Sequence, residues 1–136
     1  MCKIRNTTLA LLGATLLSTT GAGAISLGEF EYRNSCVACH GESGKGDGPV
    51  SDFLSGAEVP DLTALQKNNN GVFPVSAAYE IIDGTAEVGA HGMRDMLIWG
   101  ARYRMRAEAD PDFVEPDAYV RTRILALIEY LVEIQE

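Results

Sequence analysis

The sequence predicts an all-α protein with long loops, and three observations carry this prediction. The 136 residues are 46% hydrophobic and 22% charged, which is typical of one packed domain and not of a disordered chain. The segment near the C-terminal end repeats apolar residues at helical spacing. No run of alternating apolar and polar residues is long enough to demand a sheet.

The first 24 residues predict an export signal. Lys3 and Arg5 precede an apolar stretch of small residues, and Ala22-Gly23-Ala24 fits a signal-peptidase site. We therefore expect cleavage after Ala24, a single domain over residues 25–136 and a periplasmic location. The apolar stretch is at the short end for crossing a bilayer, so an uncleaved membrane anchor is the less favoured alternative.

The charge of the expected mature chain is strongly negative. Removing Lys3 and Arg5 leaves 9 basic residues against 19 acidic ones, a net charge of −10. Such a charge disfavours binding to nucleic acid and to anionic membranes, and it favours partners with basic docking faces.

The first half of the domain predicts a helix, a long loop and then irregular backbone. Residues 27–36 are good helix formers with Leu27 and Phe30 on one side, so a short helix is expected there. Residues 41–60 are rich in Gly, Pro, Asp and Ser, which is typical of a loop. Residues 61–74 contain a turn-prone Asn-Asn-Asn-Gly stretch and are expected to be irregular.

The second half predicts two helices around another loop. Ser76 is a plausible N-cap for a helix over residues 77–83 that Gly84 would end. Residues 87–100 contain three glycines and are expected to form a loop. Pro116 suits the first turn of a helix reaching Ile134, and its apolar stripe is Val120, Ile124, Leu127, Ile128 and Leu131.

Three arginines, Arg102, Arg104 and Arg106, form the only dense basic stretch. A solvated face is the favoured interpretation, ahead of a docking spot or a clamp for carboxylates. The long loops on either side of the predicted helices need something to pack against in so small a domain. A buried cofactor would fill that role.

A five-residue motif, Cys-x-x-Cys-His at residues 36–40, indicates which cofactor. This spacing is the attachment signature of c-type haem. Two thiols one helical turn apart can each add to one vinyl group on the same porphyrin edge, and the adjacent histidine can then bind iron. The motif predicts one covalent haem c attached through Cys36 and Cys39, with His40 as an iron ligand.

Two other interpretations of the motif are less favoured. A structural zinc site needs four ligands, and Cys39 and His40 are adjacent residues that would hardly both bind one ion in tetrahedral geometry, even with Cys36 and His91 completing the set. A thioredoxin-like dithiol is expected after a strand in a βαβ unit, which this sequence does not show.

Residues along the whole domain resemble a class I cytochrome c. The spacing Gly28-x-x-x-Tyr32-x-x-x-Cys36 is similar to the N-terminal helix of that family, where a glycine and an aromatic residue let the last helix cross closely. On this resemblance Tyr130 is the partner aromatic on the last helix. The resemblance implies the cytochrome c fold, three to five helices with long loops wrapped around the haem.

The family takes its second iron ligand from a Met-Pro-x-Trp-Gly segment before the last helix. Residues 96–100, Met-Leu-Ile-Trp-Gly, resemble that segment, which implies Met96 as the ligand. Leu97 stands where proline is usual, so the loop is expected to be less rigid. Met93, His91 and an open sixth position are the alternatives.

The resemblance also implies residues around the haem. The axial histidine of the family donates its other N–H to a proline carbonyl in a Gly-Pro context, which favours Pro49, with Pro60 as runner-up. Trp99 resembles the tryptophan that packs beside the haem, and an ordinary core aromatic is about equally favoured. Apolar walls are expected from Phe73, Tyr79, Ile82 and Leu97.

Together these features predict an electron-transfer protein and not an enzyme, with one electron carried on a haem that has His and Met ligands. The alternative is a peroxidase-like enzyme or a sensor of NO or CO with a labile sixth ligand. We expect redox proteins as partners, in free encounter or within a larger complex, and neither nucleic acid nor a small-molecule substrate. Membrane contact is expected only through an uncleaved leader or a membrane-bound partner.

Overall fold

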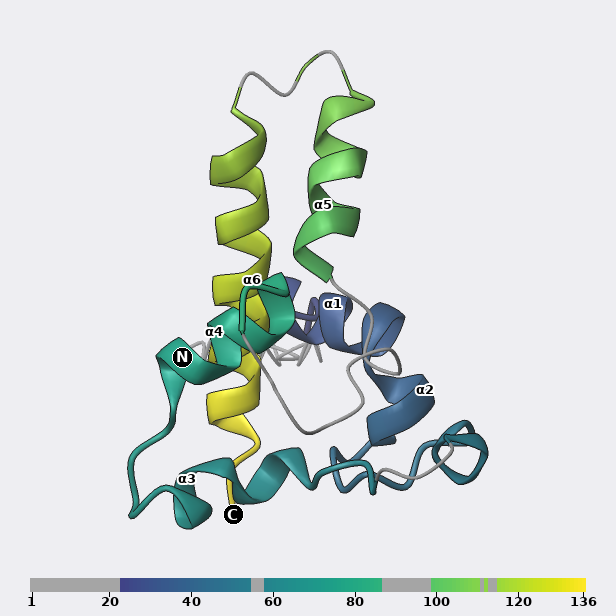
Figure 1. Cartoon of the computed structure of the whole chain (residues 1–136), viewed down its shortest axis with the longest axis vertical. Helices are drawn as coiled ribbons and strands as arrows, with labels where there is room; N and C mark the ends of the chain where they lie inside the picture. The colour runs from purple at the N-terminus through teal and green to yellow at the C-terminus, as the bar shows by residue number, and fades with distance from the viewer. Residues whose placement is uncertain (1–22, 55–57, 87–98, 111, 113–114) are drawn as a thin grey trace, which may run out of the picture.

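A computed structural model describes residues 23–54, 58–86, 99–110, 112 and 115–136. Every regular element within these ranges is helical, which confirms the all-α prediction (Figure 1). Residues 1–22 of the predicted leader and residues 87–98 of the predicted ligand loop lie outside the described residues. In the part of the chain that the model describes, no helix is long and apolar enough to cross a membrane.

Helix α1, Leu27–Ser35, confirms the helix predicted over residues 27–36. It leads directly into the short helix α2, Val37–His40. Ser26 caps α1 by accepting a hydrogen bond from the Glu29 backbone N–H at 3.0 Å. This capping bond satisfies one of the backbone N–H groups that the first turn of α1 leaves without a partner.

The buried face of α1 is not the one that its apolar residues suggested. Leu27 and Phe30 are exposed, whereas Gly28, Glu31 and Tyr32 are buried. The reason is tertiary, because the neighbouring helices require a small residue and a charge partner on this side, as described below.

The segment after α2 is a loop with short helical turns, η1 at Ser51–Phe53 and η2 at Leu62–Ala64, followed by α3 at Leu65–Asn68. The expectation of irregular backbone from residue 61 was therefore wrong for its first half. Asp61 caps η2, its carboxylate accepting hydrogen bonds from the Thr63 backbone N–H at 2.8 Å and hydroxyl at 2.6 Å.

Helix α4 spans Val75–Asp83 and ends as predicted at Gly84, whose φ of 84° lies in the left-handed region that glycine tolerates. The start was predicted wrongly. Pro74 occupies the N-cap position, and Ser76 lies inside the first turn without a capping hydrogen bond. The proline fits here because it has no N–H that a helix would leave unsatisfied.

Helix α5 spans Trp99–Glu108, so its first two residues are the last two of the segment 87–100 that was predicted to be a loop. Trp99, Tyr103 and Ala107 recur every four residues and are all buried, which makes the helical stripe visible once α6 is in place. Gly100 had favoured the loop prediction, yet here it permits close packing, since an added Cβ would lie 2.2 Å from the Asp83 carboxylate.

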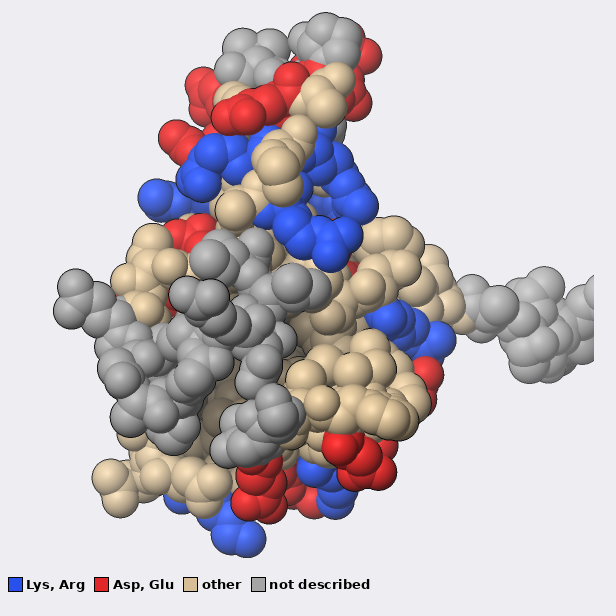
Figure 2. Space-filling model, turned by 45° about the vertical axis from the view of Figure 1, so that its right-hand side comes forward, with Lys and Arg blue, Asp and Glu red and all other residues tan. Residues whose placement is uncertain are grey.

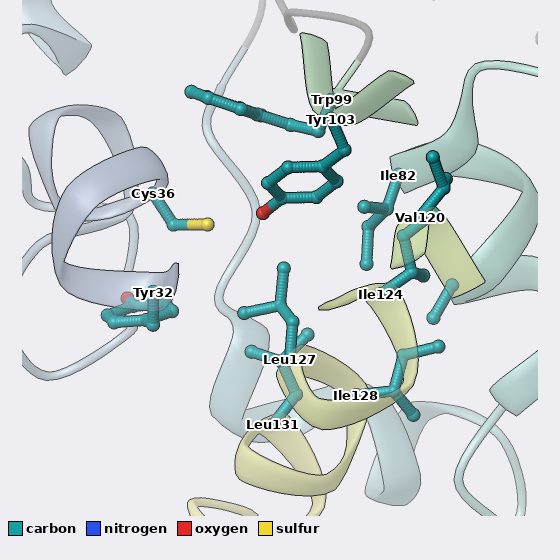
Figure 3. Packing of buried hydrophobic residues seen from close by; sticks show 11 residues of the cluster. Tyr32, Cys36, Ile82, Trp99, Tyr103, Val120, Ile124, Leu127, Ile128 and Leu131 are labelled. Atoms are coloured by element: carbon teal, nitrogen blue, oxygen red, sulfur yellow. The ribbon is translucent and has the colours of Figure 1, made fainter. Parts of the chain in front are cut away.

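Helix α6, Pro116–Glu133, confirms the last predicted helix, and its five predicted stripe residues are all buried. It is the central element, contacting α1, α4 and α5 (Figure 1). Helix α5 and the first half of α6 form a hairpin that stands away from the rest, and buried residues from α5 and from both halves of α6 belong to the core. Figure 3 shows this core, whose members include Tyr32, Ile82, Trp99, Tyr103, Ile124, Leu127 and Leu131.

The crossing of α1 over α6 depends on Gly28. A Cβ added there would lie 2.0 Å from the Ala126 carbonyl oxygen and 2.8 Å from the Tyr130 Cβ, so no other residue fits without moving a backbone. The rings of Tyr32 and Tyr130 pack with centroids 5.2 Å apart. This arrangement confirms the predicted pairing of a glycine and two aromatics at the crossing.

A buried carboxylate joins three helices. Glu31 on α1 is 2% exposed and accepts hydrogen bonds from the Tyr103 hydroxyl of α5 at 2.9 Å and from the Arg123 guanidinium of α6. Glu31 and Arg123 thus form an ion pair in which the carboxylate is buried and the guanidinium is partly exposed, and the arginine neutralises the desolvated charge of Glu31.

The buried tyrosines predict loss of stability in alkali. Burial raises the pKa of Tyr32 above its usual value, and burial together with the Glu31 bond raises the pKa of Tyr103. Below about pH 10 the phenols are neutral in both states, so their stabilisation is complete. Above that pH the unfolded chain ionises first. We expect the free energy of unfolding to fall by about 1.4 kcal/mol per pH unit for each buried tyrosine.

Denaturant unfolding followed by circular dichroism between about pH 8 and pH 12 measures this slope. Tyr103→Phe removes one of the two phenols, and its slope is expected to be smaller than that of the wild type. Equal slopes in the two proteins would contradict the assignment to Tyr103.

Candidate functional site

The candidate site is built around His40 at the end of α2. Its side chain is buried, at 7% exposure, and its Nδ1 lies 3.2 Å from the carbonyl oxygen of Pro60. A carbonyl only accepts hydrogen bonds, so Nδ1 carries the proton and Nε2 is left with its lone pair. Burial lowers the pKa of His40, and the bond to Pro60 opposes this shift only in part. The result is a neutral imidazole with one nitrogen free to bind a metal.

The acceptor of this bond corrects the sequence-based choice. Pro49 was favoured because it follows a glycine close to the motif, but the carbonyl that reaches His40 is that of Pro60, twenty residues away. Gly48 has a different use, since its backbone N–H donates to the Cys39 carbonyl at 3.1 Å. The loop therefore folds back over α2 at Gly48 before the chain returns to His40 at Pro60.

The two cysteines lie on the same short stretch as His40 and form no disulfide. Cys36 is 8% exposed, and Figure 3 shows its sulfur pointing toward the interior, where Tyr103 and Leu127 also lie. Cys39 is partly exposed. Two free thiols one helical turn apart and a buried neutral imidazole are the donor set that covalent haem attachment requires, so these residues fit that group.

A redox-active dithiol fits the site less well. Such a site depends on a thiolate whose pKa is lowered by a helix N-terminus or a nearby cation. Here burial, together with the charge of Glu31, raises the pKa of the Cys36 thiol to about 12. The described residues also contain no strand that could precede the motif. The zinc alternative includes His91, which lies outside the described residues, and within them no group of three or more His, Cys, Asp or Glu side chains is placed to hold a metal ion.

The expected pocket walls fall into two groups. Trp99 and Ile82 are members of the buried core, and Phe73 and Tyr79 are partly buried against it. Trp99 packs against Tyr103 with 6.4 Å between ring centroids, so it belongs to the buried core, and its place beside the haem stays a prediction. The predicted ligand Met96 and Leu97 lie outside the described residues, as do Met93 and His91.

The three arginines of α5 are exposed, as the solvated-face interpretation predicted. Arg102 stacks over the Trp99 ring at 4.8 Å, and Arg104 pairs with Asp117 of α6. Figure 2 shows basic side chains gathered across the hairpin of α5 and α6, with acidic side chains toward its end. Beside Arg102 and Arg106 a pocket of about 290 Å³ opens between α1 and α5, also lined by Phe30.

Comparison with protein-family models, with curated proteins and with solved structures finds no significant match for this chain.

Proposed function

We propose that this chain is an exported monohaem c-type cytochrome, an electron-transfer protein of the periplasm. The observation that carries the proposal is the buried His40, held by the Pro60 carbonyl at the end of the helix that also bears Cys39 and follows Cys36. Burial and a fixed ring orientation are what an iron ligand requires, whereas a histidine on the surface is generally exposed and free to rotate. The close crossing of α1 and α6 at Gly28 adds support, because it is one of the features on which the resemblance to class I cytochromes c depended.

Each residue has a defined part in holding the haem. Cys36 and Cys39 would add their S–H groups across the two vinyl groups, forming two thioether bonds with no net oxidation. His40 would bind iron through Nε2, and the Pro60 carbonyl would keep the ring in place. When bound, the haem iron supplies a one-electron couple. The apolar side chains around Cys36 would exclude water from it, which would favour a high potential and little rearrangement on electron transfer.

The acidic net charge of −8 for the full sequence supports partners that present basic docking faces. The second iron ligand, Met96, is proposed from the sequence alone. A thioether on the second face keeps both axial positions filled, which suits an electron carrier, whereas an open position would suit a gas sensor or a peroxidase-like enzyme.

The test is a visible and near-infrared spectrum of the purified exported protein, with a redox titration, for the wild type and Met96→Ala. We expect a six-coordinate low-spin haem, a weak far-red methionine band in the oxidised wild type, and loss of that band with a lower potential in Met96→Ala. Met93→Ala is the matched control and should keep the band. Rapid carbon monoxide binding by the reduced wild type, or an unchanged spectrum in Met96→Ala, would count against the shuttle.

A further inference from the structure

We propose that Gln135 is a positioning residue for the axial histidine: acting through residues 60–66, it holds the Pro60 carbonyl against His40 and so helps to set the reduction potential. The inference rests on the proposed function, because it assigns to a polar side chain just beyond α6 a part in tuning the iron that His40 would bind.

The Pro60 carbonyl is fixed from the side of the haem motif. The Leu62 backbone N–H, two residues after Pro60, donates to the Gly44 carbonyl at 2.7 Å. The Gly46 N–H in turn donates to the carbonyl of His40 itself at 2.9 Å. These two bonds tie the segment carrying Pro60 to the loop that follows His40, but they restrain only one side of that segment.

Gln135 supplies the restraint on the other side. Its Nε2 donates to the Leu62 carbonyl at 2.7 Å and to the Leu131 carbonyl of α6 at 2.6 Å, while its Oε1 accepts from the Gln66 backbone N–H at 2.8 Å. Both N–H donors and the oxygen of the amide are thus engaged. Leu62 is held between the haem-motif loop through its N–H and the last helix through its C=O.

The neighbouring contacts point the same way but are weaker restraints. The Glu136 backbone N–H donates to the carbonyl of the buried Thr63 at 2.9 Å. The ion pair between Lys45 and Glu136 is exposed, and such pairs add little. Among the side chains of the described residues, the Gln135 amide is therefore the one that joins α6 by hydrogen bonds to the segment that follows Pro60.

The expected effect on the haem follows from hydrogen bonding to the axial ligand. A firm Nδ1–H bond to a carbonyl raises the basicity of a metal-bound imidazole, which stabilises ferric iron. Replacing Gln135 by leucine leaves the Leu62 carbonyl and the Gln66 N–H without these partners, so the segment after Pro60 is held less firmly to the end of α6. The bond to His40 then weakens and the reduction potential rises.

The experiment compares the holoprotein of the wild type with Gln135→Leu by redox titration and by amide hydrogen exchange. At a fixed ambient potential near the wild-type midpoint, we expect the ferrous-to-ferric ratio to rise by about threefold or more. Exchange of the Leu62 amide should quicken by about tenfold. If Gln135→Leu does not fold, Gln135→Met keeps the length of the side chain without its amide N–H donors and oxygen and adds no charge, and the same upward shift is expected.

Two controls separate tuning from general destabilisation. Gln66 donates to Gln135 through its backbone N–H, so Gln66→Leu changes the side chain but keeps this hydrogen bond. This variant should leave the reduction potential unchanged. Arg123→Ala destabilises the fold away from Pro60 and should lower stability without the same shift. A Gln135→Leu protein with normal haem and wild-type potential would overturn the inference alone, whereas a wild-type chain without covalent haem would overturn the proposed function and this inference with it.

Discussion

Replacing Cys36 and Cys39 together by alanine is expected to leave the exported protein with no haem bound covalently to the chain. Each thiol supplies one of the two thioether bonds, and His40 alone provides only a reversible bond to iron. The protein is also expected to lose most of its stability, because a cofactor that is bound by the folded state and not by the unfolded chain stabilises the folded state. Haem staining of the chain after denaturing electrophoresis measures the first effect, and thermal unfolding by circular dichroism measures the second.

The third cysteine of the chain offers the matched control. Cys2 lies in the predicted leader, so Cys2→Ala should yield a mature protein with the haem content of the wild type. Haem that survives denaturation in the double variant would contradict attachment through these cysteines, and loss of haem in Cys2→Ala would contradict both the cleavage prediction and the assignment of the motif.

Arg123→Ala is expected to lower the free energy of unfolding by about 3–5 kcal/mol, the cost of leaving a buried carboxylate without its charge partner. Glu31 is 2% exposed, and the hydroxyl of Tyr103 would remain as its only side-chain partner in the described structure. Chemical denaturation at neutral pH measures the loss, since the transition midpoint reports stability directly when its slope is unchanged.

Two variants make the assignment specific. Arg121→Ala removes an exposed arginine from the same helix and is expected to change stability by less than about 0.5 kcal/mol. Adding Glu31→Gln to Arg123→Ala replaces the unpaired charge with a neutral amide and should restore part of the loss. A double variant as unstable as Arg123→Ala would show that the lost energy is packing of the arginine and not the unpaired charge.

The sequence identified the local features because each is encoded within a few residues. The stripe of α6 repeats at helical spacing, and Gly84 ends α4 where the chain needs a left-handed residue. The motif of Cys36, Cys39 and His40 is likewise local, since its chemistry needs only one helical turn. Met96 remains a prediction from such a local resemblance.

Contacts between distant segments could not be predicted in the same way. Leu27 and Phe30 looked like the inner face of α1, but the inner face is set by Gly28 and Glu31, whose partners lie on α6 and α5. Glu31 is separated from Arg123 by 92 positions, and no pattern along the chain links two isolated charges. The start of α5 at Trp99 was missed for the same reason, because its stripe is recognisable only against α6.

By itself, the sequence of this protein determined that the chain is helical and which three residues form its chemical motif. Only the tertiary structure decided that the carbonyl of Pro60, and not that of Pro49, contacts His40. It also decided that Gln135 donates a hydrogen bond to Leu62, two residues after Pro60. The physical reason is that a hydrogen bond depends on where a loop returns in space, and residues 41–54 are held by backbone hydrogen bonds to α2 that no signal within the loop encodes.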